Sequence, residues 1–293
     1  MGSVGCEQPS EPQGRFSAII VNFNSGPHLA QCLRSLVECD NVTRIVVVDN
    51  GSSDDSLSGL PGDSRIHIIR NRKNLGFSCA NNRGMAKAGD DPFLLFLNPD
   101  TIVSVGSLAA MLEFMMSHPD VGMCGPLITN PDGTEQRGCR RDEPRPFPAL
   151  KTMLGLARRG INHVDRALPS KPIEVDAISG SCMLVRRTAL EAVGPFDENY
   201  FLHCEDLDWC KRFWLAGWKV MFVPDAVITH AKGACSRGRR VRVEWHKHRG
   251  MARYYRKFQR QNHPIWVSAL ITGGIWTRFL LMAPWWYLRD RMP

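Results

Sequence analysis

Three carboxylates lie close together in the segment 200–214, whose sequence is YFLHCEDLDWCKRFW. Glu205, Asp206 and Asp208 begin a stretch in which apolar residues recur at helical spacing, which predicts that they lie in the first turn of a helix. Acidic residues at this position often do no more than complement the helix dipole. The apolar and aromatic residues before them, however, would shield them from water, and burial raises the pKa of a carboxyl group toward the value that suits a general base. The segment alone is therefore compatible with both a structural and a catalytic role.

Other polar side chains follow apolar runs that are typical of buried strands. We expect strands over 16–21, 44–49, 65–70, 93–97, 121–126, 175–185 and 219–223, with amphipathic helices between several of them. The Gly- and Pro-rich segment 130–148 is expected to be a loop, and the segment 151–170 is weakly patterned. Continuous Val and Ile runs that alternate with helices indicate an α/β fold with a mostly parallel sheet and helices on both faces. Ligands bind such sheets beyond the carboxyl ends of the strands. The polar residues at those ends are Asn22, Asn24, Asp49, Asn98 and Asp100. The two aspartates could equally cap the helices that follow them.

The composition is that of a folded protein in a reducing compartment. Of the 293 residues 43% are hydrophobic and 23% are charged, which excludes wholesale disorder. Ten cysteines are scattered without a C-x-x-C pair, and this favours reduced thiols in a cytosolic protein over a disulfide framework or a zinc site. Residues 1–14 are polar, carry no apolar signal-peptide core and are expected to be disordered.

The positive charge of the chain is concentrated near its C-terminus. The formal net charge is +8, and the segment 237–260 alone holds ten basic residues and one acidic residue. The following segment, 265–288, is apolar and rich in tryptophan, and it is long enough to span a bilayer. Arg278 and Pro284 interrupt it, so we expect this part of the chain to lie in the membrane interface beside the basic segment. The alternative is a helix that packs on the rest of the domain.

Seven stretches of the chain, in this order, resemble glycosyltransferase family 2. They are VNFN, VVVDNGSSDDS, NRKNLGFSCANNRG, LLFLNPD, SGSCMLVRR, GPFDENYFLHCEDLDWCKR and ITHAKGACS, and they cover about residues 16–236. The family consists of inverting enzymes with a GT-A fold, and the chain looks most like its bacterial rhamnosyltransferase-like branch. The resemblance implies a GT-A catalytic domain over residues 15–236. The basic, Trp-rich region over 237–293 lies beyond it and is expected to be a helical appendage.

The resemblance also implies a donor site for a nucleotide-sugar. Asp49 would bind the nucleobase edge or the ribose of the donor. The other residues assigned to the donor site are Asn22, Asn24, Asn74, Gly76, Asn81 and Asn98. Asn98 stands where the family has the first aspartate of its Asp-x-Asp motif, which removes one possible charge from the metal site.

Metal ligands and the base are implied in the same way. Asp100 and His230 would hold Mg²⁺ or Mn²⁺ on the donor diphosphate, and the cation would stabilise the leaving group as a Lewis acid. Asp206 would be the general base that takes a proton from the acceptor hydroxyl, and Glu205 would orient it. A one-step displacement inverts the anomeric configuration. Outside this resemblance, His230 could be a buried histidine with ordinary hydrogen bonds.

The resemblance implies that the protein transfers a sugar. It favours L-rhamnose from dTDP-L-rhamnose, and a UDP-sugar is the alternative donor. The expected acceptor is a saccharide on polyprenyl diphosphate in cell-surface polysaccharide synthesis, reached by an enzyme bound peripherally to the cytoplasmic face of the plasma membrane. A nucleotide-dependent oxidoreductase is disfavoured because no G-x-G-x-x-G follows the first strand. A sugar-nucleotidyltransferase would need a Gly-rich phosphate loop, which residues 22–30 lack. A nucleic-acid-binding protein would explain the basic segment, but the apolar tail fits a bilayer better, so no nucleic-acid partner is expected.

Overall fold

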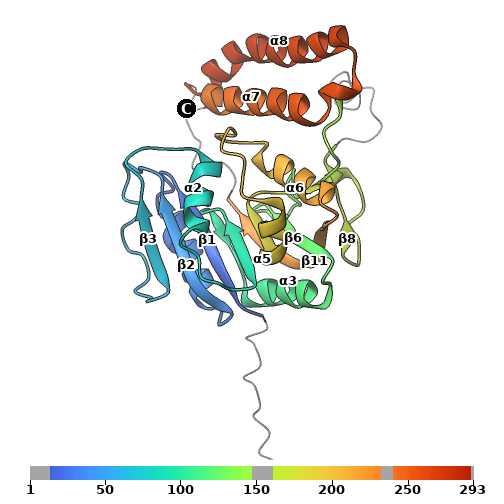
Figure 1. Cartoon of the computed structure of the whole chain (residues 1–293). Helices are drawn as coiled ribbons and strands as arrows, with labels where there is room; N and C mark the ends of the chain where they lie inside the picture. Colours follow the sequence, from blue (N-terminus) through green and yellow to red (C-terminus); the bar gives the residue numbers. More distant parts are fainter. Residues whose placement is uncertain (1–13, 147–160, 232–239, 292–293) are drawn as a thin grey trace, which may run out of the picture.

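A mixed sheet of nine strands runs through the part of the chain that the structure describes, residues 14–146, 161–231 and 240–291 of a computed structural model (Figure 1). The strand order is β3-β2-β1-β4-β10-β6-β11-β5, and β8 pairs with β11. The strands are β1 (Phe16–Asn22), β2 (Val42–Asp49), β3 (Ile66–Arg70), β4 (Phe93–Leu97), β5 (Thr101–Ile102), β6 (Val121–Thr129), β8 (Ile173–Glu174), β10 (Cys182–Arg186) and β11 (Lys219–His230). The helices are α1 (His28–Val37), α2 (Phe77–Met85), α3 (Val105–Ser117), α5 (Arg187–Val193), α6 (Glu205–Leu215), α7 (Arg240–Phe258) and α8 (Ile265–Arg289).

Helices cover both faces of the parallel part of the sheet, as the continuous apolar runs predict. In β2, Val46 and Val48 belong to a cluster with Ala80 of α2, whereas Ile45 and Val47 belong to the main core with Leu33 of α1. The expected α/β fold is therefore confirmed. Strands β3, β2, β1 and β4 are parallel, and β10 then runs antiparallel between β4 and β6. A mostly parallel sheet was expected, but the pairs that β10 forms with β4 and β6 are antiparallel.

Two expected strands have different bounds in the structure. The segment 175–185 is divided into β9 (Ala177–Ile178) and β10, because Ser179 and Ser181 form a local turn through their hydroxyls, which lie 2.6 Å apart. Strand β9 pairs with β7 (Arg140–Arg141) in a separate two-stranded sheet, where a loop was expected. Strand β11 continues past Pro224 to His230, because the ladder to β6 is irregular between Val223 and Val227 and needs no amide hydrogen there.

The C-terminal part of the chain forms a helical hairpin. Helices α7 and α8 are joined through a short 3₁₀ turn, η3 (Arg260–Asn262), and a second such turn, η1 (His163–Asp165), lies elsewhere in the chain. Helix α7 lies between α8 and the rest of the molecule, and α8 is outermost (Figure 1). Among the described residues, α8 is the one helix long and apolar enough to cross a membrane, by length and composition only. The expected disordered start of the chain and part of the weakly patterned segment 151–170 lie outside the described residues.

Candidate active site

Asn22 and Asp49 meet where two parallel strands end. They are register partners at the carboxyl ends of β1 and β2, and both are buried. The Asn22 amide donates hydrogen bonds to Asp49 Oδ1 at 3.0 Å and to the hydroxyls of Ser52 and Ser56 at 3.1 and 2.9 Å. Asn22 thereby orients the Asp49 carboxylate, and two of the predicted donor-site residues are brought together at one sheet edge.

Asn50 connects this edge to the loop that carries Asn74 and Gly76. Its amide nitrogen lies 3.0 Å from Asn74 Oδ1 and 3.2 Å from the Gly76 carbonyl oxygen, and its Oδ1 accepts from the Leu75 amide at 3.0 Å. Gly76 has φ +89°, and a Cβ there would stand 2.8 Å from the carbonyl oxygen of Phe201. A side chain would push the donor-site loop away from the segment that leads to the acidic helix. Asn50 was not predicted as a site residue.

Two further asparagines that were predicted for the donor site, Asn24 and Asn81, differ in their contacts. Asn24 has φ +53° and accepts a hydrogen bond from the Ser53 amide at 2.8 Å, so it lies beside the loop that follows Asp49. Asn81 is buried, and its amide donates to the Phe77 carbonyl oxygen of its own helix at 3.0 Å. The contacts of Asn81 are those of a helix residue, and its predicted contact with a nucleotide stays a prediction.

Asp100 and His230 also meet, although 130 positions separate them in the chain. Asp100 follows β4, His230 ends β11, and His230 Nε2 lies 3.0 Å from Asp100 Oδ1. The Asn98 amide nitrogen lies 3.4 Å from the same ring nitrogen. Among the described residues, no cluster of three or more His, Cys, Asp and Glu side chains forms a metal site. One carboxylate and one imidazole, both nearly buried, fit a divalent cation whose other positions are taken by phosphate oxygens and water.

Gln136 contacts the other side of the His230 ring. Its Oε1 lies 2.7 Å from His230 Nδ1, and its amide nitrogen lies 3.2 Å from the His230 carbonyl oxygen. Gln136 is buried and comes from the Gly- and Pro-rich segment in which the sequence predicted only a loop. No pattern in the sequence distinguishes this glutamine from the charged and turn residues around it.

Asp206, the predicted base, lies at the start of α6 on the same edge of the sheet. Its carboxylate accepts hydrogen bonds from the amides of Gly180 at 3.2 Å and Leu207 at 2.8 Å. Gly180 lies in the turn before β10. The carbonyl oxygen of the next residue, Ser181, accepts a hydrogen bond from the backbone N–H of Asn98 at 2.9 Å. The turn before β10 therefore connects Asp206 directly to the segment that carries Asn98 and Asp100.

Arg141 of β7 forms an ion pair with Asp206 and also donates to the Ile178 carbonyl oxygen at 3.1 Å. Glu205 was expected to orient Asp206, but its Oε2 has no hydrogen-bond partner among the described residues. Burial, together with the adjacent charge of Asp206, raises the pKa of Glu205 well above its usual range, which favours its protonated form. The contacts that hold Asp206 come from Arg141 and two backbone amides, and the orienting role of Glu205 stays a prediction.

Known proteins that resemble this chain show its family. The family model described as "Glycosyl transferase family 2" matches residues 17–194. The chain belongs to glycosyltransferase family 2. It is 32% identical over 249 residues to N-acetylglucosaminyl-diphospho-decaprenol L-rhamnosyltransferase of Mycobacterium tuberculosis, with 75% of this chain and 77% of the relative covered. It is 31% identical over 216 residues to rhamnosyltransferase WbbL of Escherichia coli, with 70% and 79% covered.

Solved structures agree on the fold of this family 2 transferase. The mannosyltransferase PcManGT from Pyrobaculum calidifontis, in complex with GDP-Man and Mn²⁺, has a TM-score of 0.57 and 17% identity, and covers 94% of this chain and 72% of its own. GalNAc-T7 with UDP, GalNAc and Mn²⁺ has a TM-score of 0.58 and 18% identity, over 75% of this chain and 44% of its own. These likenesses show the GT-A fold of the transferase.

The segment before the acidic helix of the transferase has an unusual backbone. His203 and Cys204 have φ values of +67° and +71°, in the left-handed region that residues with a side chain rarely adopt. Helix α7 packs against this pair, and a Cβ at its Gly250 would lie 2.8 Å from the His203 carbonyl oxygen. Helix α7 thus supports the segment that delivers Glu205 and Asp206.

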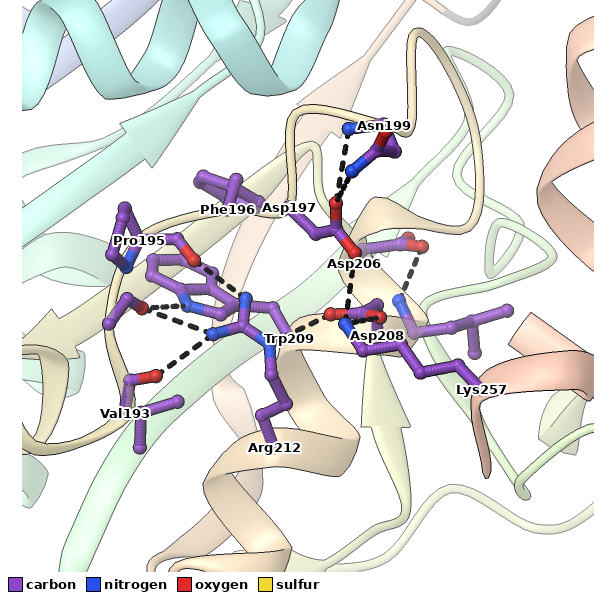
Figure 2. A network of polar contacts seen from close by, with 12 residues as sticks. Val193, Pro195, Phe196, Asp197, Asn199, Asp206, Asp208, Trp209, Arg212 and Lys257 are labelled. Atoms are coloured by element: carbon purple, nitrogen blue, oxygen red, sulfur yellow. Dashed lines mark hydrogen bonds and ion pairs between the residues drawn. The ribbon is translucent and has the colours of Figure 1, made fainter. Parts of the chain in front are cut away.

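Asp208, the third carboxylate of the acidic segment, has a structural role in the transferase (Figure 2). Its side chain is 1% exposed and lies between Arg212 Nε at 2.8 Å and Lys257 Nζ at 2.6 Å. Lys257 also contacts Asp197 at 3.0 Å, and Arg253 contacts the same carboxylate at 2.7 Å. Burial would raise the pKa of Asp197, but hydrogen bonds from Arg253, Asn199 and Lys257 hold it well below its usual range. Two basic residues of α7 therefore face the domain and join α7 to α6.

Proposed function

We propose that this transferase moves L-rhamnose from dTDP-L-rhamnose to a saccharide on a polyprenyl diphosphate, with inversion at the anomeric carbon. The similarity to two rhamnosyltransferases, one of them named for a decaprenol-linked acceptor, supports this choice of donor and acceptor. The observation that carries the reaction type is that Asp206 and the Asp100–His230 pair occupy one edge of the sheet, connected through the turn before β10. A UDP-sugar is the alternative donor.

The residues at this edge of the sheet would have separate roles in the reaction. Asp49, held by Asn22, would bind the nucleoside of the donor, while Asp100 and His230 would hold Mg²⁺ or Mn²⁺ at its diphosphate. The bound cation would stabilise the charge that develops on the leaving diphosphate. Asp206 would accept the proton of the acceptor hydroxyl as that oxygen attacks the anomeric carbon. A single displacement of this kind leaves the new glycosidic bond with inverted configuration.

The purified full-length protein can be tested with a panel of donors, dTDP-L-rhamnose, UDP-glucose, UDP-N-acetylglucosamine and GDP-mannose, and a short-chain N-acetylglucosaminyl diphosphate lipid as acceptor. We expect transfer from dTDP-L-rhamnose at least about tenfold faster than from the others, since one well-placed contact is worth a factor of this size. The anomeric configuration of the product, read by NMR, should be inverted. Preferential transfer from a UDP-sugar would establish the alternative donor, and a retained configuration would contradict the mechanism.

We further propose that the hairpin of α7 and α8 holds the enzyme on the cytoplasmic face of the plasma membrane, where a lipid-linked acceptor presents its sugar. Helix α8 exposes large apolar side chains, among them Ile265, Trp266, Leu270, Leu280, Leu281, Trp285 and Leu288. Its one mid-helix cation, Arg278, is turned toward α7, with Nη1 2.9 Å from His248 Nε2. Exposed cations of α7, such as Arg249 and Arg256, would attract an anionic leaflet at about 1 kcal/mol each.

Combining Leu280→Glu, Leu281→Glu and Trp285→Glu should lower binding to phosphatidylglycerol-containing vesicles at least about tenfold, because each change places a charge on the exposed apolar face. Vesicle sedimentation measures the bound fraction. Leu168→Glu is the matched control, since Leu168 is 50% exposed on another part of the surface. If the unmodified protein does not sediment with these vesicles, or if the control loses binding equally, the membrane proposal is wrong.

A further inference from the structure

A series of hydrogen bonds runs from the turn after β6 to the imidazole of His230, and its members fix one another's orientation. It passes through Asp132, Thr134, Asn130 and Gln136, in a turn closed by backbone hydrogen bonds from Asn130 to Thr134 at 2.8 Å and from Gly133 to Asn130 at 2.9 Å. No role follows from the family resemblance for these residues. The inference drawn from them rests on the proposed metal site.

The series starts at a carboxylate that can only accept. Asp132 Oδ1 lies 2.6 Å from Thr134 Oγ1 and 3.0 Å from the Thr134 amide nitrogen. These hydrogen bonds lower the pKa of Asp132, so the carboxylate is ionised at neutral pH. The hydroxyl hydrogen of Thr134 must therefore point to Asp132, and the oxygen of that hydroxyl is left to accept.

The next two side chains are amides, and each has one possible orientation. Asn130 Nδ2 donates to Thr134 Oγ1 at 2.9 Å, which turns Asn130 Oδ1 toward Gln136 Nε2 at 3.0 Å. Gln136 Nε2 also lies 3.2 Å from the carbonyl oxygen of His230, a second acceptor. Because both neighbours of this nitrogen are acceptors, Gln136 must present its Oε1 to His230 Nδ1, 2.7 Å away.

The consequence falls on the other nitrogen of the ring. Since Gln136 Oε1 can only accept, His230 Nδ1 carries the hydrogen, and in the neutral ring Nε2 has a free lone pair. Nε2 faces Asp100 Oδ1 at 3.0 Å, and the Asn98 amide nitrogen, a donor, lies 3.4 Å from it. Two acceptor atoms this close to each other are stable only with a proton or a cation beside them.

We propose that the turn 130–136 is a positioning device for His230: it holds the ring in the Nδ1–H tautomer and so keeps Nε2 available to a divalent cation shared with Asp100. Gln136 is the positioning residue, and Thr134 and Asn130 fix its orientation. Hydrogen bonds to the far nitrogen of a ligating histidine commonly have this effect, and their loss typically weakens metal binding about 10–100-fold.

The tautomer can be read without metal, nucleotide or activity, by long-range ¹H–¹⁵N NMR of the full-length protein labelled in its histidine rings. Spectra are recorded at alkaline pH, where histidine is neutral, and the His230 signals are identified by their loss in His230→Gln. We expect the unmodified protein to show Nε2 as the unprotonated nitrogen. In Gln136→Met, which removes the acceptor, the hydrogen should move to Nε2 and toward the Asp100 carboxylate.

Thr134→Val and Thr134→Ser extend the test to a site away from the metal. Valine keeps the shape but removes the hydroxyl, so it should shift the tautomer partly, whereas serine keeps the hydroxyl and should leave the spectrum unchanged. Mn²⁺ binding, followed by the EPR signal of free Mn²⁺, should weaken at least about tenfold in Gln136→Met and little in Thr134→Ser.

An Nε2–H tautomer in the unmodified protein, or an unchanged tautomer in Gln136→Met, would overturn the inference. Mn²⁺ affinities equal to that of the unmodified protein in Gln136→Met and Thr134→Val would overturn it as well. Should Gln136→Met fail to fold, Thr134→Val decides by the same two measurements. Failure of the proposed function is a distinct result, because the tautomer is measured with no metal, donor or acceptor present.

Discussion

Replacing Asp206 by asparagine should lower the turnover number of the transferase at least about a hundredfold and leave its affinity for the nucleotide-sugar nearly unchanged. An amide cannot take up the proton of the acceptor hydroxyl. The hydrogen bonds of Asn22, Asp49 and Asn74 at the proposed donor site do not involve Asp206, so donor binding should survive. Steady-state kinetics give the turnover number, and calorimetric titration with the donor gives its affinity.

Asp208→Asn is the matched control, two residues further along the same helix. It removes the charge that lies between Arg212 and Lys257, and loss of one partner in so buried an ion pair costs about 3 kcal/mol of unfolding free energy. We therefore expect Asp208→Asn to lower stability and to preserve turnover per folded molecule. Asp206→Asn also removes the partner of Arg141, but it should be distinguished by its loss of turnover per folded molecule. Turnover close to that of the unmodified enzyme in Asp206→Asn would exclude Asp206 as the base.

Removal of divalent cations should abolish transfer, and added Mg²⁺ or Mn²⁺ should restore it. Asp100→Ala and His230→Ala should each raise the cation concentration needed for half-maximal activity at least about tenfold, because each removes one of two protein ligands. Asp120→Ala serves as the control, since this aspartate is on the surface and paired with Lys219. Activity that is indifferent to EDTA would show that a site with Asn98 in place of a first aspartate works without metal.

The parts of the site that could be predicted from the sequence are those attached to regular elements. Buried runs of Val, Ile, Leu and Phe locate the strands, and a polar residue directly after such a run must lie at a sheet edge. Asp49 and Asp100 were found in this way, and the helical spacing after Glu205 located α6. The chemistry assigned to these positions came from the family resemblance.

The supporting residues could not be predicted, because their partners are distant in the chain and no regular pattern marks them. Arg141 lies 65 positions before Asp206, and Gln136 lies 94 positions before His230. Strand β7, which carries Arg141, is two residues long and follows a Gly-rich turn, so no periodicity announces it. The left-handed backbone of His203 and Cys204 was equally hidden, since neither residue is glycine.

Charge counting located the basic segment but not the direction of its side chains. Arg253 and Lys257 form ion pairs with Asp197 and Asp208, although part of the Lys257 side chain stays on the surface, whereas Arg249 and Arg256 are exposed. Arg278 was expected to keep the apolar segment from spanning a bilayer, and its side chain is turned toward His248 of α7. A count of charges treats all these cations alike, and only packing separates the ones that stabilise α7 from the ones that can meet a partner.

The contact of Gly250 with the His203 carbonyl oxygen has a consequence for the kinetics of the enzyme. Helix α7 touches the backbone before Asp206 with one of its sides, and it touches α8 with another. If α8 lies on a bilayer, Asp206 is held at a constant height above that surface. The enzyme and its lipid-linked acceptor then diffuse in the same two dimensions. The acceptor concentration that matters is then its surface density, so KM for the acceptor should be expressed as a mole fraction of lipid and not as a molarity.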